Sequence, residues 1–348
     1  MSHSSHHHST LPRYTTLTQS ANLKHIGVYT SGGDAPGMNA AIRAVVRTAL
    51  HHGIRVTGIT HGYRGLHGGA QKHAWLALDS RSMGNILQSG GTFLKTARLP
   101  EFSNSDVRTQ TAQTIRQAGL DALVCIGGDG SFQGAHLLWK EHGIPIVGIP
   151  GTIDNDIAGT DATIGFDTAV NTAVQAIDRI RDTADSHERL FIVEVMGRDS
   201  GFIALETGLA GGAEEIFFAD NPVTVDEAIQ HIRQGLASGK RSSILVTVEG
   251  QKPGRAYDLA ESIRKKSGFE AKVCVLGHVL RGGAPTVFDR NLASRMGAGA
   301  VALLQQGYCD AMMTWTHGQV SPAPFEPNLG RRKRVEPAWI RLAQTLSY

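Results

Sequence analysis

The feature that most constrains the fold of this chain is a short apolar run followed by an acidic turn. The run from Ile144 to Ile149 predicts a buried strand of a parallel sheet, because it is short, mainly apolar and bounded by a turn. The turn places Thr152, Asp154 and Asp156 at alternate positions, which share one face in extended backbone. A hydroxyl and two carboxylates at the carboxyl end of a strand suit proton removal from an alcohol, or positioning of a magnesium–phosphate group. An Asx-rich turn that caps the next helix is the plainer alternative.

Length and composition bound what the chain can be. At 348 residues it exceeds one ordinary hydrophobic core, so we expect two similar α/β lobes. Hydrophobic residues at 41% and charged residues at 19% are typical of a soluble globular protein. The formal charge of +3 gives no reason to expect a nucleic-acid partner, and the absence of a long apolar run predicts no membrane span.

The cysteines and the two ends of the chain carry weaker signals. Cys125, Cys274 and Cys309 lack the spacing of metal ligands, which favours reduced thiols in a cytoplasmic protein. Residues 1–20 are rich in Ser, Thr and His and have no periodicity, so we expect a disordered leader. The tail, residues 331–348, opens with a basic run. We expect it to wrap the surface with its charges solvated or at a subunit contact, and we assign it no chemistry.

Two further strand–turn–helix units precede the acidic turn. The first unit has a strand at residues 24–30 and the turn Ser31-Gly32-Gly33-Asp34, and the second has a strand at 122–126, the turn Gly127-Gly128-Asp129-Gly130-Ser131 and a helix from Phe132. A glycine-rich turn before a helix offers amide groups and the positive helix end to phosphate. In the second unit the small residues suit a polyphosphate, and the carboxylate is placed to hold magnesium directly or through water. An ordinary tight turn explains the first unit equally well.

Between these two units the chain has a long irregular region. It runs from the end of a strand at residues 54–59 to Arg98. Loops of this length in a compact lobe tend to carry function. Arg98 therefore could contact phosphate, and an ordinary surface cation is the alternative.

A second series of strands and helices follows an amphipathic helix expected from Phe166 to Ile180. Arg189 opens a strand that ends at Met196-Gly197-Arg198. A cation at the carboxyl end of a strand fits recognition of an anionic substrate, and a structural ion pair of Arg198 with Glu194 or Asp199 is the alternative.

Two later strands deliver more polar residues to the same end of this series. The strand at residues 243–248 leads to Glu249, and the last strand leads to Gly277–Gly283. There His278 and Arg281 could form a phosphate clamp, although a lone histidine is more often a satisfied neutral side chain.

Jointly, these residues resemble one family, the 6-phosphofructokinases, and specifically its bacterial ATP-dependent type. The similarity covers about residues 24–310. The resemblance implies an α/β fold of two doubly wound lobes with mainly parallel sheets and an active site in the cleft between them. It implies a nucleotide-binding lobe of residues 21–165 plus about 279–330, and a sugar-phosphate-binding lobe of residues 166–278. The motifs that carry the resemblance are Thr30–Asn39, Gly127–Ser131, Pro150–Asp156, Met196–Arg198 and Gly277–Gly283.

The resemblance also implies an activity: magnesium-dependent transfer of the γ-phosphoryl group of ATP to the 1-hydroxyl of fructose 6-phosphate, a step of glycolysis that yields fructose 1,6-bisphosphate and ADP. Asp154 is similar to the general base of the family, with Thr152 and Asp156 supporting the sugar and magnesium. Arg198 is suited to stabilising the transferring phosphoryl group, and Asp129 resembles the magnesium ligand. The other implied contacts are Gly32, Arg98, Gly128, Gly130 and Ser131 for ATP, and Met196, Gly197, Glu249, His278 and Arg281, with Arg189 from a neighbouring subunit, for the sugar phosphate.

Some positions depart from the family pattern. Lys272 stands where most relatives have an Arg that binds the 6-phosphate across an interface, so we expect weaker sugar-phosphate affinity or broader acceptor choice. A site shared between subunits implies an oligomer, in this family usually a homotetramer. An allosteric site for ADP or phosphoenolpyruvate is only partly kept, since Ser80-Arg81 and Ser238 replace the usual residues, and we expect altered regulation. The positions that resemble this effector site are Arg43, Arg47, Arg181, Glu214, Lys240 and Arg241.

The donor can be argued from two glycines. Pyrophosphate-dependent relatives carry Asp where Gly130 stands and Lys where Gly151 stands, and those side chains fill the space of the α-phosphate. The remaining alternatives are a pyrophosphate-dependent enzyme, a kinase of another sugar phosphate, or a catalytically silent nucleotide-binding regulatory subunit. The presence of both Asp154 and Asp129 disfavours the silent subunit.

Overall fold

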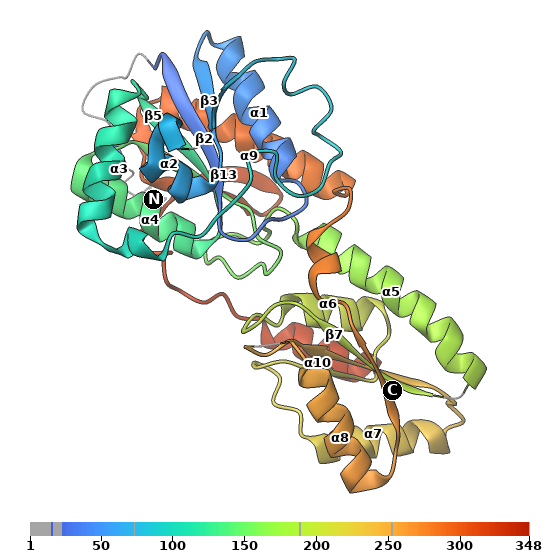
Figure 1. Cartoon of the computed structure of the whole chain (residues 1–348). Helices are drawn as coiled ribbons and strands as arrows, with labels where there is room; N and C mark the ends of the chain where they lie inside the picture. The colour runs from blue at the N-terminus through green and yellow to red at the C-terminus, as the bar shows by residue number, and fades with distance from the viewer. Residues whose placement is uncertain (1–14, 17–22, 73, 188, 252, 348) are drawn as a thin grey trace, which may run out of the picture.

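The protein consists of two α/β lobes of different size (Figure 1). The computed structural model describes residues 15–16, 23–72, 74–187, 189–251 and 253–347. We call the part built on a seven-stranded sheet the larger lobe and the part built on a four-stranded sheet the smaller lobe. The expectation of two α/β lobes is confirmed, and their sheets differ in size. The expected leader lies outside the described residues except for β1 (Thr15–Thr16), which pairs with β11 (Tyr308–Cys309).

The larger sheet has the order β13-β12-β6-β5-β2-β3-β4, and its five middle strands are parallel. Both edge strands run antiparallel to their neighbours. The apolar runs of the sequence became central strands because they are buried on both faces. The strands are β2 (His25–Ser31), β3 (Arg55–Ile59), β4 (Trp75–Leu78), β5 (Ala122–Gly127), β6 (Ile146–Pro150), β12 (Ala311–Thr316) and β13 (Gln319–Pro324).

Helices cover both faces of this sheet. One face packs against α1 (Met38–His51) and α9 (Val287–Gln305), which also pack against each other. The other face packs against α2 (Gly62–Lys72) and α4 (Asp129–His142), with α3 (Ser105–Gln117) outside them and the short helix η1 (Pro100–Ser103) beside α3. The prediction of an irregular region up to Arg98 was wrong for the first part of that region, because α2 and β4 lie there.

The smaller sheet is wholly parallel, with the order β10-β7-β9-β8. One face packs against α5 and α6, and α10 packs on α6; the other face packs against α8, with α7 beside it. The strands are β7 (Leu190–Val195), β8 (Glu215–Phe217), β9 (Ser243–Val248) and β10 (Ala271–Val275), and the helices are α5 (Phe166–His187), α6 (Phe202–Ala210), α7 (Val225–Ala237), α8 (Arg255–Ser267) and α10 (Pro337–Leu346).

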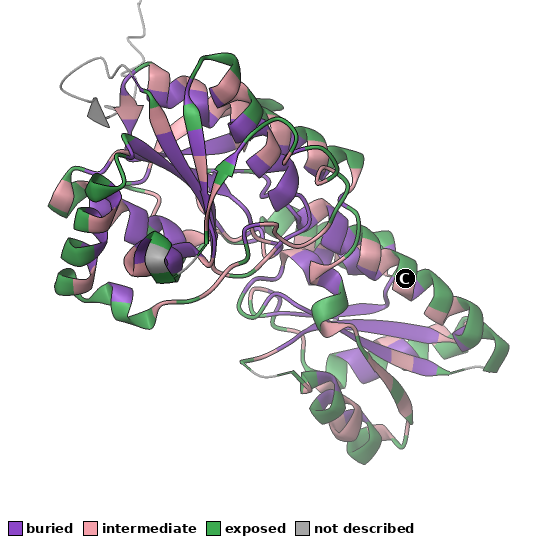
Figure 2. Ribbon diagram, turned by 45° about the horizontal axis from the view of Figure 1, so that its top comes forward, coloured by how far each residue is buried: buried purple, intermediate pink, exposed green. Residues whose placement is uncertain are grey.

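The chain connects the lobes at the start of α5, at the short helix η2 (Gly277–Arg281), and through residues 326–336, which we call the crossing segment (Figure 1). One apolar core is continuous from the α1–α9 layer to the α5–α6 layer, and both sheets lie within buried residues (Figure 2). This continuity fixes the two lobes against each other and so defines the space between them. Among the described residues, no helix combines the length and the apolar composition that a membrane crossing requires.

Candidate active site

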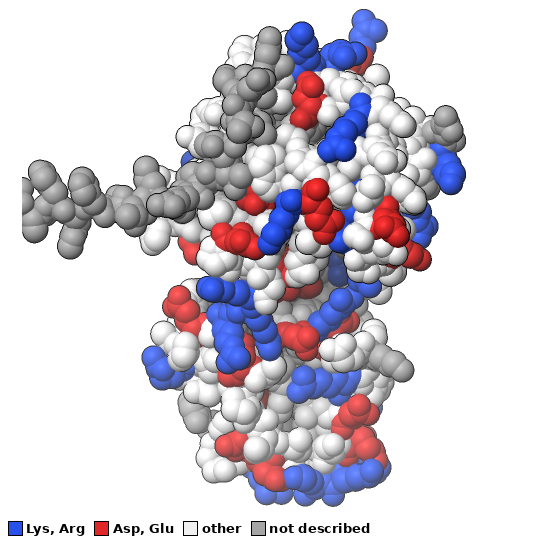
Figure 3. Space-filling model, turned by 90° about the vertical axis from the view of Figure 1, so that its left-hand side faces the viewer, with Lys and Arg blue, Asp and Glu red and all other residues white. Residues whose placement is uncertain are grey.

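A cavity of about 470 Å³ lies where the two lobes meet, and it contains the turns predicted to bind phosphate. The molecule is visibly hollowed between its lobes, and both basic and acidic side chains lie along this hollow (Figure 3). The cavity walls come from the carboxyl ends of β2, β5 and β6, which are neighbours in the larger sheet, together with Arg198 and Arg281. Ligands of open α/β sheets bind at this edge, so the cavity is the candidate active site.

The glycine-rich turn after β5 forms one wall of the cavity. It runs directly into α4, which begins at Asp129 rather than at Phe132 as expected. A Cβ atom added at Gly128 or Gly130 would meet no atom within 4 Å, so both positions open onto free space. The first amide groups of α4 have no partner within the helix, and together with the helix dipole they favour an anion there.

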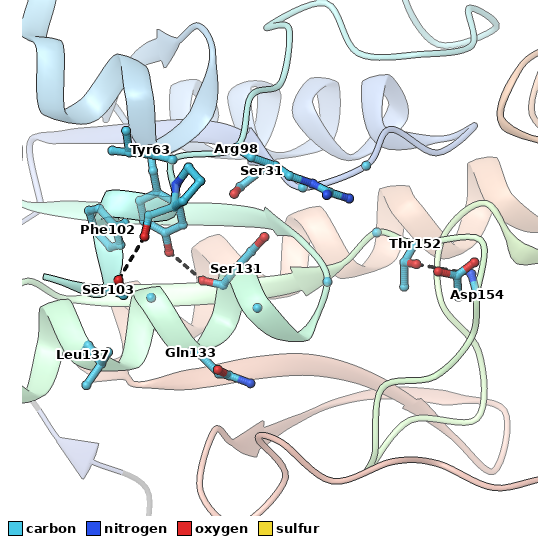
Figure 4. A pocket seen from close by; sticks show the side chains of 18 of the residues that line it. Ser31, Tyr63, Arg98, Phe102, Ser103, Ser131, Gln133, Leu137, Thr152 and Asp154 are labelled. Carbon is cyan, nitrogen blue, oxygen red and sulfur yellow. Dashed lines mark hydrogen bonds between the residues drawn. The ribbon is translucent and has the colours of Figure 1, made fainter. Parts of the chain in front are cut away.

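The acidic turn after β6 forms the floor of the cavity at its other end (Figure 4). Thr152, Asp154 and Asp156 are half-buried, whereas Ile153 and Asn155 between them are buried. The predicted shared face is therefore present, although the backbone is a turn with Asn155 at a φ of 50° rather than an extended strand. The Thr152 hydroxyl accepts a hydrogen bond from the Asp154 backbone amide at 3.2 Å, which orients the Thr152 side chain relative to the backbone of the turn.

Burial controls the protonation of these two carboxylates. Burial raises the pKa of Asp154, and the nearby Arg281 and Arg198 partly oppose this shift. Burial also raises the pKa of Asp156 to about 6, with a further contribution from the charge of Asp154. A carboxylate with a raised pKa is a stronger proton acceptor, which is what removal of an alcohol proton requires.

The smaller lobe contributes the residues predicted to bind the sugar. β7 ends at a tight turn in which the Ser200 amide donates to the Gly197 carbonyl at 2.7 Å, and Arg198 adopts a left-handed φ of 52°. Such strained backbone is typical of functional sites. Glu249 follows β9; burial raises its pKa, and the charges of Arg198, Arg281 and His278 partly oppose this shift. These side chains therefore share one electrostatic environment with Asp154, and Met196, which directly follows β7, is buried.

The chain as a whole matches known proteins. The family model described as phosphofructokinase matches residues 25–304. The chain belongs to the phosphofructokinase family. Among curated relatives, "ATP-dependent 6-phosphofructokinase 1" of Thermus thermophilus is 52% identical over 93% of this chain and 100% of its own length. The ATP-dependent 6-phosphofructokinase of Coxiella burnetii is 50% identical over 92% of this chain and 97% of its own.

Solved phosphofructokinase structures share the fold. The structure of phosphofructokinase from Saccharomyces cerevisiae has a TM-score of 0.80 and 34% identity over 88% of this chain, which spans 44% of the yeast chain. The pyrophosphate-dependent phosphofructokinase from Marinobacter aquaeolei has the same TM-score of 0.80 at 21% identity, covering 93% of this chain and 91% of its own. The two-lobed α/β arrangement is thus the phosphofructokinase fold.

Two residues predicted to bind the sugar phosphate lie elsewhere. Arg189 and Lys272 flank the amino ends of β7 and β10, at the edge of the smaller sheet opposite Arg198 and Glu249. They line a separate cavity of about 420 Å³ together with Arg241. Within one phosphofructokinase chain the structure therefore does not bring these two cations to the active-site cleft.

The predicted effector residues also fall into two places. Arg181, Glu214, Lys240 and Arg241 line a surface cavity of about 520 Å³, in which Lys240 and Glu214 approach to 3.5 Å. Arg43 and Arg47 lie instead on α1 of the larger lobe. Within one chain the six residues therefore do not form a single site.

The carboxylates of the cleft fit magnesium in the way this ion usually binds. Asp129, Asp154 and Asp156 line one cavity of about 300 Å³, which supplies the oxygen ligands that magnesium prefers. Within the described part of the chain, no group of three or more His, Cys, Asp or Glu side chains is close enough to enclose a metal ion. Magnesium typically binds through one or two carboxylates and the phosphates of a substrate, so the site fits an ion that arrives with a nucleotide.

Sequence reasoning missed several residues of the cleft. Tyr63, Phe102 and Leu137 gather at the end of the cavity away from Asp154 (Figure 4). The Tyr63 ring stacks on Phe102 with centroids 4.0 Å apart, and its hydroxyl donates to the Ser131 carbonyl at 2.5 Å. The tail was also misjudged, because Lys333 is half-buried and its Nζ donates to the Asp161 carbonyl at 2.8 Å. No periodicity or motif marks these positions, since they meet only after the chain has folded.

Proposed function

We propose that this chain transfers the γ-phosphoryl group of ATP to the 1-hydroxyl of fructose 6-phosphate, with magnesium, giving fructose 1,6-bisphosphate and ADP. The observation that supports this conclusion is that Asp154 lines the same cavity as the glycine-rich turn at the start of α4. Two ATP-dependent 6-phosphofructokinases that match over nearly their whole length support it. The enzyme is accordingly a transferase of glycolysis.

In this mechanism Asp154 acts as the general base. Its carboxylate accepts the proton of the sugar 1-hydroxyl, whose oxygen forms the new bond to the γ-phosphorus. The bond from that phosphorus to the oxygen bridging the β and γ groups breaks, and ADP leaves with its electron pair. Asp129 would hold magnesium together with the phosphates of ATP, and the ion would neutralise charge on those phosphates. The guanidinium of Arg198 stabilises the negative charge that spreads over the transferring group.

The remaining contacts follow from the two ends of the cleft. Gly32, Gly128, Gly130 and Ser131 bind the phosphates of ATP, with Arg98 beside them. The aromatic and apolar end formed by Tyr63 and its neighbours is the place for the adenine base. On the other side Thr152, Asp154, Met196, Gly197, Arg198 and Glu249 hold the sugar ring, and His278 and Arg281 bind its 6-phosphate.

The division of the chain follows the same logic. Residues 21–165 with about 279–330 form a nucleotide-binding domain, and residues 166–278 form a sugar-phosphate-binding domain that the tail 331–348 joins. This assignment is supported by the two sheets and by the position of the glycine turn on the larger one.

Assembly into a homotetramer with shared active sites completes the proposal. Arg189 and Lys272 lie away from their own cleft, so a neighbouring subunit is needed to bring them to the sugar 6-phosphate. Apolar side chains exposed near η2, among them Val279 and Val287 at 61% and 74%, are suited to a subunit contact. Arg43, Arg47, Arg181, Glu214, Lys240 and Arg241 then form an ADP or phosphoenolpyruvate site across subunits in a cytoplasmic, allosteric enzyme.

A coupled assay with fructose 6-phosphate and magnesium tests the activity. We expect turnover with ATP but not with pyrophosphate, and a loss of 10²–10⁴-fold in kcat in Asp154→Asn, the range that general base catalysis typically contributes. Asp258→Asn, an exposed acid on α8, is the matched control and should leave kcat unchanged. Turnover with pyrophosphate alone would instead favour a pyrophosphate-dependent enzyme, and no turnover with either donor would favour another sugar phosphate or a silent subunit.

A further inference from the structure

The crossing segment is held firmly at both ends. Before it, Phe325 is fully buried in the larger lobe and packs on Phe132 of α4, with ring centroids 5.3 Å apart. Near its other end, Val335 is buried in the core that both lobes share, and α10 then packs on α6. The backbone between these anchors has little freedom, so its contacts in the cleft have a defined geometry.

One contact of the segment fixes the carboxylate of Asp129. The Gly330 amide donates to Oδ1 at 3.0 Å, and the Gln133 side chain, one turn along α4, donates to Oδ2 at 2.6 Å. Each carboxylate oxygen thus has one N–H donor from a different part of the chain. Two such bonds define the plane of the carboxylate, while each oxygen keeps further acceptor capacity for a cation.

A second contact involves Lys333 and the acidic turn. The Lys333 amide donates to the Asp156 carbonyl at 3.3 Å, and Nζ donates to the Asp161 carbonyl at 2.8 Å. Nζ also lies over the ring of Phe202 on α6, 4.7 Å from its centroid. Lys333 therefore hydrogen-bonds to the loop of residues 152–161 at two points and, through its contact with Phe202, connects this loop to the smaller lobe.

The partial burial of Lys333 costs desolvation free energy that a surface lysine does not lose. Burial lowers the pKa of Lys333 to about 8, and the charges of Asp161, Glu206 and Asp156 oppose this effect. A half-buried cation costs desolvation energy, which attraction to these carboxylates offsets. In return its charge lowers the pKa of Asp156, whose ionised form burial disfavours.

From these contacts we propose that Lys333 is a positioning residue for catalysis, which holds the loop bearing Asp154 in place while the crossing segment orients Asp129. The inference rests on the proposed function, since it assigns Asp154 as the base. It extends the active site to a stretch of chain that follows every motif of the cleft. Its prediction is that loosening the loop slows the chemical step more than it weakens ATP binding.

The test compares Lys333→Gln, Lys333→Arg and the matched control Arg334→Gln, which removes an exposed charge next to it in the chain. For Lys333→Gln we expect kcat to fall at least tenfold, with the KM for ATP changed less than threefold. Hydrogen exchange of the amides at residues 154–161 should become at least tenfold faster. Lys333→Arg should recover most of both properties, and Arg334→Gln should match the unmodified chain.

Three outcomes would overturn the inference. One is equal kcat and equal exchange in Lys333→Gln and Arg334→Gln. Another is a rise in the KM for ATP at unchanged kcat, which would make Lys333 a binding residue. The third is a Lys333→Gln chain that does not fold by circular dichroism, which would make its role structural. If the unmodified chain has no kinase activity, the proposed function fails, whereas the exchange comparison still decides whether Lys333 holds the loop.

Discussion

At the scale of single residues, the acidic turn shows how far a sequence pattern can predict a site. The alternation of Thr152, Asp154 and Asp156 with buried neighbours followed from side-chain spacing alone, and the structure has it. The hydrogen bonds of Lys333 to this loop could not be predicted, because a run of basic residues is typical of any solvated surface segment. Its partner Asp161 lies 172 positions earlier in the chain, and no local signal links two such residues.

The protonation of the acidic turn predicts an acid limb in the pH profile. The base works only when ionised, and burial raises the pKa of Asp154, so kcat should fall as the pH falls through that raised value. Because burial raises this pKa, we expect the limb at a pH above the ordinary aspartate value of 3.8. The measurement is kcat at saturating substrates between about pH 4.5 and 9.

A variant sharpens this prediction. Asp156→Asn removes a negative charge beside Asp154, so ionisation of Asp154 becomes easier and the acid limb should move to lower pH. Full recovery of activity after return to pH 7 would control for acid unfolding. A limb centred near pH 4 in the unmodified chain, or an unchanged limb in the variant, would contradict this account.

At the scale of elements, strand-like runs and helical stripes predicted most of the secondary structure, because hydrophobic periodicity reports burial directly. The strands β5 and β9 and the helix α5 were evident for this reason. The helix α2 was missed because Gly62, Gly65, Gly68 and Gly69 interrupt its pattern, and Gly69 even has a left-handed φ of 67°. Tertiary packing rather than propensity keeps this helix formed.

Asp289 of α9 binds the start of α5, so we expect that truncating this side chain lowers the stability of the protein. Asp289, fully buried on α9, accepts hydrogen bonds from the amides of Gly165 and Thr168 at 2.9 Å and from the Thr168 hydroxyl. Asp289→Ala leaves three buried donors without a partner and should lower the free energy of unfolding by about 3 kcal/mol. Urea unfolding measures this, with the exposed Asp182→Ala of α5 as control. Equal unfolding midpoints would show that water replaces the lost acceptor.

A charged side chain at the start of α4 should weaken the use of ATP as phosphoryl donor. Gly130 is the second residue of α4 and an added side chain meets open cavity, so Gly130→Asp should fold normally. Its carboxylate would occupy phosphate space and repel ATP, raising the KM for ATP at least tenfold. Gly130→Ala adds a methyl group without charge and should raise this KM much less. Steady-state kinetics with both donors would reveal the effect, and equal KM values for the two variants would exclude repulsion as its cause.

At the scale of the whole molecule, the length of the chain predicted two lobes but not the unequal size of their sheets. The larger sheet gains β12 and β13 only after the chain has returned from the smaller lobe. The position of Arg189, outside its own cleft, also depends on which edge of the sheet faces which lobe. Both properties follow from the order in which strands associate, and that order has no counterpart in local sequence.

Subunit mixing tests whether active sites are shared. Arg189→Ala and Asp154→Asn should each be nearly inactive alone. When the two variants are unfolded together and refolded, some clefts would combine an intact Asp154 with an intact Arg189 from a neighbour, so activity should return. A mixture no more active than its components would place Arg189 outside the neighbour's site. Light scattering of the refolded mixture controls for assembly.

The return of the chain through the crossing segment has a consequence for biosynthesis. The ribosome synthesises all four strands of the smaller sheet before it makes β12, β13 and the residues that contact the acidic turn. Domains generally begin folding during synthesis from the amino-terminal side, so here the smaller lobe can form on the nascent chain while the larger sheet still lacks two strands. A message cut short before residue 326 would thus yield a chain that carries Asp129 and Asp154 yet lacks Gly330 and Lys333, the groups that hold them in place.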